Sequence, residues 1–153
     1  MHIPAKADYA IRALVALAAA DGGPLTGRAI AEVEDIPPKF LDLILSELRR
    51  SGFIRSIRGP EGGYVLARPA KSISLADIIR VLDGPLAEVR GVRPESTSYS
   101  GPAAPLRDVW LAARVALRKV LETTSIDDVA KNHLSSHVRR LVADPDALVS
   151  RIN

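Results

Sequence analysis

Apolar residues recur every three or four positions in several segments of the chain, which is the spacing of one buried face of an α-helix. The first such segment covers residues 6 to 20 and stops at Asp21-Gly22-Gly23-Pro24. A short second helix is expected over residues 27 to 33, with Thr26 as its N-cap. The pattern therefore predicts two helices separated by a glycine- and proline-rich connection.

A third helix is expected to begin at Pro37-Pro38, since proline is tolerated in a first helical turn, and to end at Gly52. Its apolar stripe, all expected in the core, comprises Phe40, Leu41, Ile44, Leu45 and Leu48. Residues 53 to 58 then alternate in the manner of a strand, residues 59 to 63 form a glycine-rich turn, and residues 64 to 66 return as a second strand. The three turn glycines are expected to allow positive φ angles.

The second half of the chain predicts further helices around one long irregular segment. Ser74 and Asp77 form a capping-box pair at the start of a helix that ends near Asp83. Residues 85 to 105 contain four prolines and are expected to form an irregular or mobile loop. A long helix follows over residues 106 to 121, a short one is capped by Ser125, and the tail is only weakly amphipathic.

The order of these elements predicts a mainly α protein containing a winged helix-turn-helix. In that arrangement one helix enters a major groove about 12 Å wide, and a hairpin beside it reaches the neighbouring backbone or minor groove. Charge supports this, because residues 49 to 71 contain six basic residues and a single acid. That segment carries a net charge of +5, whereas the whole 153-residue chain carries +3. A solvated basic face is the alternative explanation of the charge alone.

Composition excludes several classes of protein. Aromatic residues make up only 4% of the chain, which favours an aliphatic helical core over a β-sandwich. Cysteine is absent, so there is no disulfide framework and no thiol nucleophile. Neither a signal peptide nor a membrane span is predicted, and we expect a cytoplasmic protein. There is no GxSxG elbow and no acid–base constellation, so an enzyme is not expected.

Several motifs resemble the IscR/NsrR/CymR (Rrf-two type) family of bacterial transcriptional regulators. They are Lys6-Ala7-Asp8-Tyr9-Ala10, Ile36-Pro37-Pro38-Lys39-Phe40-Leu41, Leu48 to Ile54 running into Arg58-Gly59-Pro60-Glu61-Gly62-Gly63-Tyr64, Ser74 to Ile79, Asp108-Val109-Trp110 and Ser125 to Val129. The resemblance covers about residues 1 to 130, and its wing motif is the most specific part. It implies a homodimer in which each subunit supplies one winged helix-turn-helix and the long helices cross between subunits.

The resemblance also implies a domain organisation and functional residues. Residues 1 to 84 would bind double-stranded DNA, residues 85 to 105 form a loop, and residues 106 to 153 hold the dimerisation helix and tail. The DNA-binding candidates are Lys6, Tyr9, Pro38, Lys39, Asp42, Leu43, Arg49, Arg55, Arg58 and Gly59. The dimerisation candidates are Val109, Trp110, Ala113, Leu117 and Val120.

Some of these candidates have more than one interpretation. Lys39 could donate to guanine or phosphate, and Asp42 could accept from a cytosine amino group. Leu43 could meet a thymine methyl group or pack against the first helix. Arg58 could enter a narrow minor groove or simply face solvent. Tyr9 could approach a phosphate or belong to the core.

Sensor members of this family hold an iron–sulfur cluster with three cysteines in the loop before the long helix, and here that loop contains none. We therefore predict no cofactor and no metal. His133 and His137 would share a helical face, but two ligands are too few for a metal site. Control is expected from a small molecule, from a partner protein or from abundance alone. Trp110 could line an effector pocket with Tyr99 and Arg107, or it could anchor the core or the dimer interface.

The predicted function is a homodimeric, sequence-specific transcriptional regulator, most simply a repressor, that binds a pseudo-palindromic operator. The alternative is a winged-helix protein-interaction module that has lost DNA binding. Leu43 supports that alternative, because a polar residue is usual at an exposed position that contacts bases.

Overall fold

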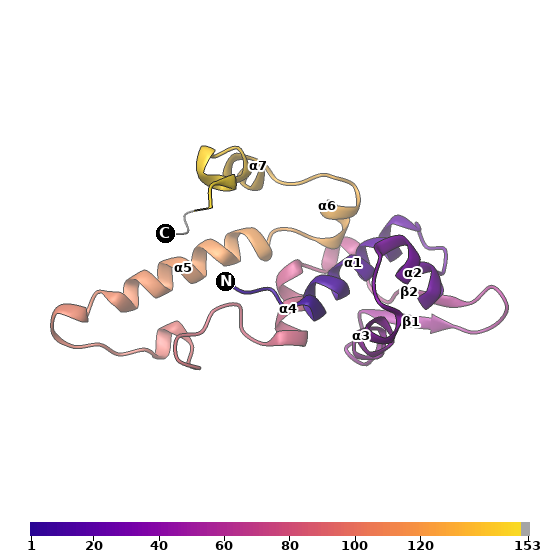
Figure 1. The fold of residues 1–153 in the computed structure, drawn as a ribbon, viewed down its shortest axis with the longest axis horizontal. Coiled ribbons are helices and arrows are strands. Elements are labelled where there is room, and N and C mark those ends of the chain that lie inside the picture. The colour runs from indigo at the N-terminus through magenta and orange to yellow at the C-terminus, as the bar shows by residue number, and fades with distance from the viewer. Residues whose placement is uncertain (151–153) are drawn as a thin grey trace.

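A computed structural model of the chain describes residues 1–150 (Figure 1). The helices are α1 (Ala5–Ala19), α2 (Gly27–Glu34), α3 (Pro38–Arg50), α4 (Leu75–Asp83), α5 (Leu106–Leu121), α6 (Ile126–Ala130) and α7 (Ser136–Val142), and the strands are β1 (Ile54–Ile57) and β2 (Gly63–Leu66). The two strands are antiparallel, with Ile54 opposite Leu66 and Ile57 opposite Gly63. The hairpin they form lies at one end of the molecule, and the start of α5 lies at the other (Figure 1).

Helix α1 is the centre of the core. Its small residues Ala7, Ala10 and Ala13 are completely buried, which lets neighbouring helices approach its backbone closely. Leu14 of α1, Ile30 of α2 and Leu48 of α3 meet in this core with no exposed surface. Each such side chain contributes about 1.5–3 kcal/mol through burial. The helix-turn-helix is therefore held by aliphatic packing around α1.

Helix α3 follows the predicted stripe with one exception. Leu41, Ile44, Leu45 and Leu48 are buried as expected, whereas Phe40 is 61% exposed. The prediction that Phe40 belongs to the core is wrong. Successive helical residues are separated by about 100°, so Phe40 lies at the edge of the stripe, and the core needs only Leu41 from this turn. An aromatic side chain is thereby left on the outer surface at the start of α3.

The wing has the predicted hairpin and one strand-like partner that the sequence did not predict. Leu25, just before α2, exchanges backbone hydrogen bonds with Tyr64 of β2, at 3.1 and 2.7 Å. Gly59 and Gly63 have the expected positive φ values of 110° and 148°. Gly62 does not; a Cβ there would lie 2.1 Å from the carbonyl oxygen of Ile57, so close approach of the backbone explains this glycine.

Helix α6 returns from the C-terminal half and packs into the core beside α1. Ile126 has no exposed surface and belongs to the same hydrophobic cluster as Leu14. Its amide donates to the carbonyl of Ile73 at 2.9 Å, and the amide of Leu75 donates to Thr124 at 3.0 Å. The N-terminal unit of the fold thus includes a segment that the sequence analysis assigned to the dimerisation helix and tail.

Capping boxes stabilise the N-termini of α4 and α6, the two helices that these backbone hydrogen bonds join. Ser74 caps α4 with Asp77, as predicted, and Ser125 caps α6 with Asp128. The backbone N–H and then the hydroxyl of Ser125 donate to the Asp128 carboxylate, and these bonds hold the pKa of Asp128 below its usual value. The charged form of Asp128 is therefore the one that fits the folded state.

The segment between α4 and α5 has little regular structure, as predicted. It contains a bridge between Val89 and Val92 and two 3₁₀ turns, Pro94–Ser96 and Gly101–Ala103. Pro94 and Thr97 are buried, and the Thr97 hydroxyl donates to the Pro94 carbonyl at 2.7 Å. Helix α5 then runs back along the molecule (Figure 1), and none of its residues is buried. Over residues 1–150, no helix is both long enough and apolar enough to cross a membrane.

Candidate nucleic-acid interface

Helices α2 and α3 are joined by a tight turn that fixes the direction of α3. Asp35 adopts a left-handed conformation with φ 50° and ψ 52°, and ends α2. The amide of Ile36 donates back to Ala31 at 3.0 Å, and the buried Ile36 side chain anchors the turn. Pro37 and Pro38 then start α3 without requiring hydrogen-bond partners for their nitrogens. The start of α3 is consequently presented at the surface.

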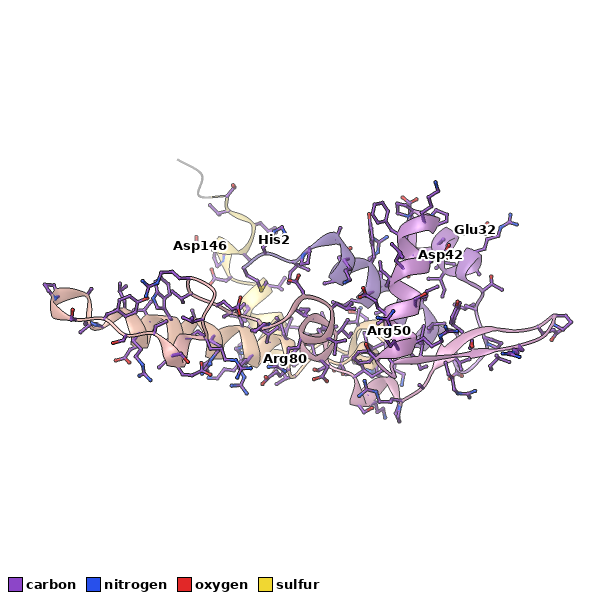
Figure 2. All side chains as sticks on the ribbon, turned by 90° about the horizontal axis from the view of Figure 1, so that it is seen from below. His2, Glu32, Asp42, Arg50, Arg80 and Asp146 are labelled. Carbon is purple, nitrogen blue, oxygen red and sulfur yellow. The ribbon has the colours of Figure 1, made fainter. Side chains whose placement is uncertain are left out.

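The outer face of α3 carries the predicted contact residues together. Pro38, Lys39, Asp42 and Leu43 are all exposed, and Leu43 is 68% exposed. That exposure rules out burial of Leu43 against α1, and a contact with a thymine methyl group stays a prediction. Lys39 has no hydrogen-bond or ion-pair partner among residues 1–150. In Figure 2, Asp42 lies near one end of α3 and Arg50 near the other, beside the wing strands.

The wing places a second group of cations beside α3. Arg55 and Arg58 are exposed on and just after β1, and Gly59 follows at the start of the turn. Arg49 is exposed in the last turn of α3, together with Arg50. The Arg68 guanidinium instead stacks on the ring of Phe53, 4.3 Å from its centroid. The described surface thus combines an α-helix face with a basic hairpin.

The two candidates on α1 are less free than those on α3. Lys6 forms an ion pair with Glu47 of α3 at 2.8 Å and donates to the Leu82 carbonyl at 3.4 Å. Tyr9 is half-buried against the core, with the Arg12 guanidinium 5.4 Å from its ring centroid. Both residues help to hold α1 against its neighbours, and phosphate contact by either stays a prediction.

The sequence analysis did not single out Arg28, which lies beside this face. Arg28 is in the first turn of α2, and its side chain is 88% exposed and paired with Glu32 at 3.0 Å. A cation in a first turn opposes the helix dipole, and here Glu32 on the same helix supplies the compensating charge. The basic residue directly after the N-cap Thr26 is the signal in the sequence that marks this position. Arg28, Glu32, Pro38 and Asp42 are among the residues that line a groove of about 630 Å³ between α2 and α3.

Helix α5 carries the predicted dimerisation seam without a partner. Val109 is 53% exposed, Ala113 is exposed, and Leu117 and Val120 are half-buried. Trp110 points to the preceding loop, where its indole N–H donates to the Tyr99 hydroxyl at 3.0 Å. An apolar stripe of this kind on a projecting helix fits packing against another helix.

The predicted effector residues are only partly brought together. Trp110 and Tyr99 are in contact, whereas Arg107 donates to the backbone carbonyl of Glu95 at 3.3 Å. His133 and His137 are not on one helix, because His133 precedes the start of α7 at Ser136. Within residues 1–150, no group of three or more histidine, cysteine, aspartate or glutamate side chains is placed to hold a metal ion.

Iron chemistry is a natural question for a chain of this resemblance, and the donor set does not fit a cluster. The 153 residues contain no cysteine, so there is no thiolate to bind iron. The side chains of this protein therefore do not fit a thiolate-held iron–sulfur cluster.

Known proteins are similar to this chain in both sequence and fold. A family profile described as Rrf2, iron-dependent transcriptional regulator, matches residues 3–132. Rv1287 of Mycobacterium tuberculosis, named as an HTH-type transcriptional regulator, is 49% identical over 145 residues, which cover 94% of this chain and 90% of that protein. The regulator CymR of Bacillus subtilis is 36% identical over 131 residues, covering 85% and 90%.

Solved structures agree with these matches. The structure of CymR, described as the global cysteine regulator of B. subtilis, superimposes with a TM-score of 0.74 at 34% identity and covers 86% of this chain and 98% of that one. IscR of T. potens gives a TM-score of 0.69 at 28% identity, covering 87% and 88%. These matches confirm the mainly α, winged helix-turn-helix fold and the resemblance noted in the sequence. The chain belongs to the Rrf2 family of transcriptional regulators.

Proposed function

We propose that this protein is a homodimeric, sequence-specific DNA-binding repressor that works in the cytoplasm without an iron–sulfur cluster. The single observation that carries the proposal is the exposed face of α3 beside the basic wing. There Lys39, Asp42 and Leu43 project from one helix, and Arg55 and Arg58 project from the adjoining hairpin. A helix of this kind fits the major groove, and a cationic hairpin fits the phosphates or minor groove next to it.

The chemistry of the three α3 side chains supports direct recognition of bases. Lys39 offers donors for guanine O6 and N7, Asp42 offers an acceptor for the cytosine amino group, and Leu43 offers an apolar surface for a thymine methyl group. The exposed Phe40 ring lies next to them on the outer surface. The arginines of the wing would displace counterions from phosphates, and binding should therefore weaken as salt rises.

Dimerisation is supported by the unpartnered seam of α5. A second copy packing on Val109, Ala113 and Val120 would remove their exposed apolar surface from water. Two-fold symmetry would then place two α3 helices on successive major grooves, about 34–36 Å apart or at a multiple of that distance. A dimer seated on an operator within a promoter would block access of the transcription machinery, which is the simplest form of repression.

The absence of cysteine favours regulation that does not use an iron–sulfur cluster. Because the chain has no cysteine, a thiolate-held cluster and a thiol-oxidation switch both lack their reactive group. A small molecule or partner protein would then take the controlling role, or abundance alone would set repression. Its relatives in the family are transcriptional regulators, and no catalytic activity is proposed.

In-vitro selection of random duplexes by the full-length protein tests the proposal. We expect enrichment of a two-fold symmetric site, and affinity for it should fall steeply in a salt titration, by about one unit of logarithmic slope for each phosphate contact. Enrichment of asymmetric single half-sites would contradict dimeric binding. Absence of any enrichment, together with weak binding to all duplexes, would favour the protein-interaction module, for which the exposed Phe40 and Leu43 would supply an apolar docking surface.

Leu43 provides a sharper test at the level of one methyl group. In the selected duplex, replacing the contacted thymine by uracil should lower affinity about fourfold, since burial of one methyl group is worth about 0.8 kcal/mol. With Leu43→Ala the same replacement should have no effect, because the contact has already been removed. Competition binding with the four combinations gives the coupling directly. Equal sensitivity of both proteins to uracil would show that Leu43 does not contact the methyl group.

A further inference from the structure

An arginine-lined cavity of about 400 Å³ lies between α4, the loop that follows it, and α5. Its walls carry four guanidinium groups, from Arg80, Arg93, Arg114 and Arg118, and a single carboxylate, from Glu95. The aliphatic part of the lining comes from Pro85, Leu86 and Ala87. This cavity is separate from the exposed face of α3 and from the wing.

The carboxylates of the chain do not balance these arginines. Glu122, which is outside the lining, accepts hydrogen bonds from both Arg80 and Arg118. The Oδ1 atom of Asp77 lies 3.9 Å from the Nη1 atom of Arg80. Glu95 pairs with Arg114. Arg93 has no hydrogen-bond or ion-pair partner among residues 1–150. The cavity therefore keeps an excess of positive charge after every internal pair has been counted.

One polar atom at this site is left without a partner. The Nε of Arg114 is buried and makes no hydrogen bond, although another nitrogen of the same guanidinium pairs with Glu95. A buried donor without an acceptor is costly, because it has lost its hydrogen bonds to water. The carboxylates of residues 1–150 therefore do not satisfy the full hydrogen-bonding capacity of the Arg114 guanidinium.

The state of the two glutamates agrees with a strongly cationic environment. Hydrogen bonds from Arg80 and then Arg118 hold the pKa of Glu122 below its usual value. The pKa of Glu95 is also lowered, first by a hydrogen bond from its own backbone and then by the nearby charges of Arg114 and Arg93. Both side chains are thus anions that compete with any outside anion for the same guanidinium groups.

We infer that this cavity binds a small organic anion that carries a carboxylate or phosphate group. The planar guanidinium groups of Arg93 and Arg114 would hold the anionic group, since such groups form paired hydrogen bonds with carboxylates and phosphates. The aliphatic wall at Leu86 would contact the carbon skeleton. The bound anion would link α4, the loop and α5, which makes it a candidate effector; that regulatory role rests on the proposed function, whereas the binding itself does not.

Isothermal titration calorimetry on the full-length protein, without DNA, tests the inference. Succinate and inorganic phosphate are titrated separately at low ionic strength, with succinamide as an uncharged analogue of succinate. We expect saturable binding of at least one anion, at one per chain, and none of succinamide. Binding of succinate alone would identify a carboxylate ligand, and binding of phosphate alone a phosphate ligand. Failure of both anions to saturate would overturn the inference.

Amino-acid substitutions test whether the anion binds in this cavity or on the basic wing. Arg93→Gln should weaken anion binding at least tenfold, because it removes a charge-assisted partner and breaks no hydrogen bond or ion pair within residues 1–150. Glu95→Gln should strengthen it several-fold, because Arg114 is released from its competing carboxylate. Arg58→Gln, on the wing, and Arg140→Gln, exposed on α7, should leave it unchanged. An equal loss of anion affinity in Arg58→Gln and Arg93→Gln would show general charge attraction and would contradict the assignment of binding to this cavity.

Discussion

Replacing both Lys39 and Arg58 by alanine is expected to lower operator affinity at least a hundredfold at low salt. The two residues lie on different elements, Lys39 in the first turn of α3 and Arg58 beyond the end of β1, and both are exposed. Neither has a hydrogen-bond or ion-pair partner within residues 1–150, so their removal leaves no internal partner unsatisfied. Loss of one base or phosphate contact costs about 1–3 kcal/mol per half-site, and a two-fold dimer loses each contact twice.

The single variants should differ in kind as well as in size. If Lys39 contacts a base, Lys39→Ala relaxes the preference at one position of each half-site; if it contacts a phosphate, affinity falls evenly for all sequences and the salt slope decreases by about one unit per contact. Arg58→Ala should reduce the salt slope in the same way. Fluorescence anisotropy on the selected duplex and on single-base variants of it distinguishes these cases.

Arg140→Ala is the matched control, because Arg140 is also exposed but lies on α7, away from α3 and the wing. It should bind the operator as well as the unaltered protein does. A Lys39→Ala, Arg58→Ala double variant that bound with unchanged affinity at low salt would show that α3 and the wing do not form the DNA-binding surface.

Ile126→Ala is expected to lower the free energy of unfolding by about 2–5 kcal/mol, the usual cost of deleting a large buried aliphatic side chain. Ile126 has no exposed surface and lies in the core with Leu14 and Leu45, although it is more than 70 residues distant in sequence. Truncation would leave a cavity between α6 and α1. It would also loosen the backbone contact between Ile126 and Ile73 that joins the two halves of the chain.

Urea denaturation followed by circular dichroism measures this loss, with protein concentration held constant because the proposed dimer would make apparent stability depend on concentration. Val142→Ala serves as the control, since Val142 is a 65% exposed aliphatic residue on α7 and should change stability by less than about 0.5 kcal/mol. A similarly small effect of Ile126→Ala would mean that α6 does not dock on the N-terminal unit in solution.

In α3, helical periodicity predicts which residues are buried, except at the edge of the apolar stripe. The spacing of Leu41, Ile44, Leu45 and Leu48 predicted the buried face correctly, since the 3.6-residue repeat is a local property of the backbone. Phe40 was assigned to the same face because it is apolar and adjacent. Whether a residue at the edge of a stripe is covered depends on what the neighbouring elements supply, and here the side chain of Phe40 stays 61% exposed.

Contacts between distant segments had no signal in the sequence. The pairing of Leu25 with Tyr64 and of Thr124 with Leu75 uses backbone atoms, which every residue has, so the side chains do not reveal it. The arginine cavity is a similar case. Its four guanidinium groups are spread over residues 80 to 118, and only the folding of the loop against α5 brings them to one place.

The sequence by itself determined the helices and strands as far as α6, their order and most of their chemistry, whereas α7 lies in the tail, for which the pattern predicted no helix. Helix periodicity, capping residues and the glycine-rich turn are short-range effects, and they were sufficient to predict the winged helix-turn-helix and the exposed positions of Lys39, Asp42 and Arg58. Only the tertiary structure decided that Phe40 faces outward, that Ile126 completes the N-terminal core and that Arg93 and Arg114 share a cavity. Those outcomes depend on which surfaces meet across long stretches of chain, and a local pattern of residues does not contain that information.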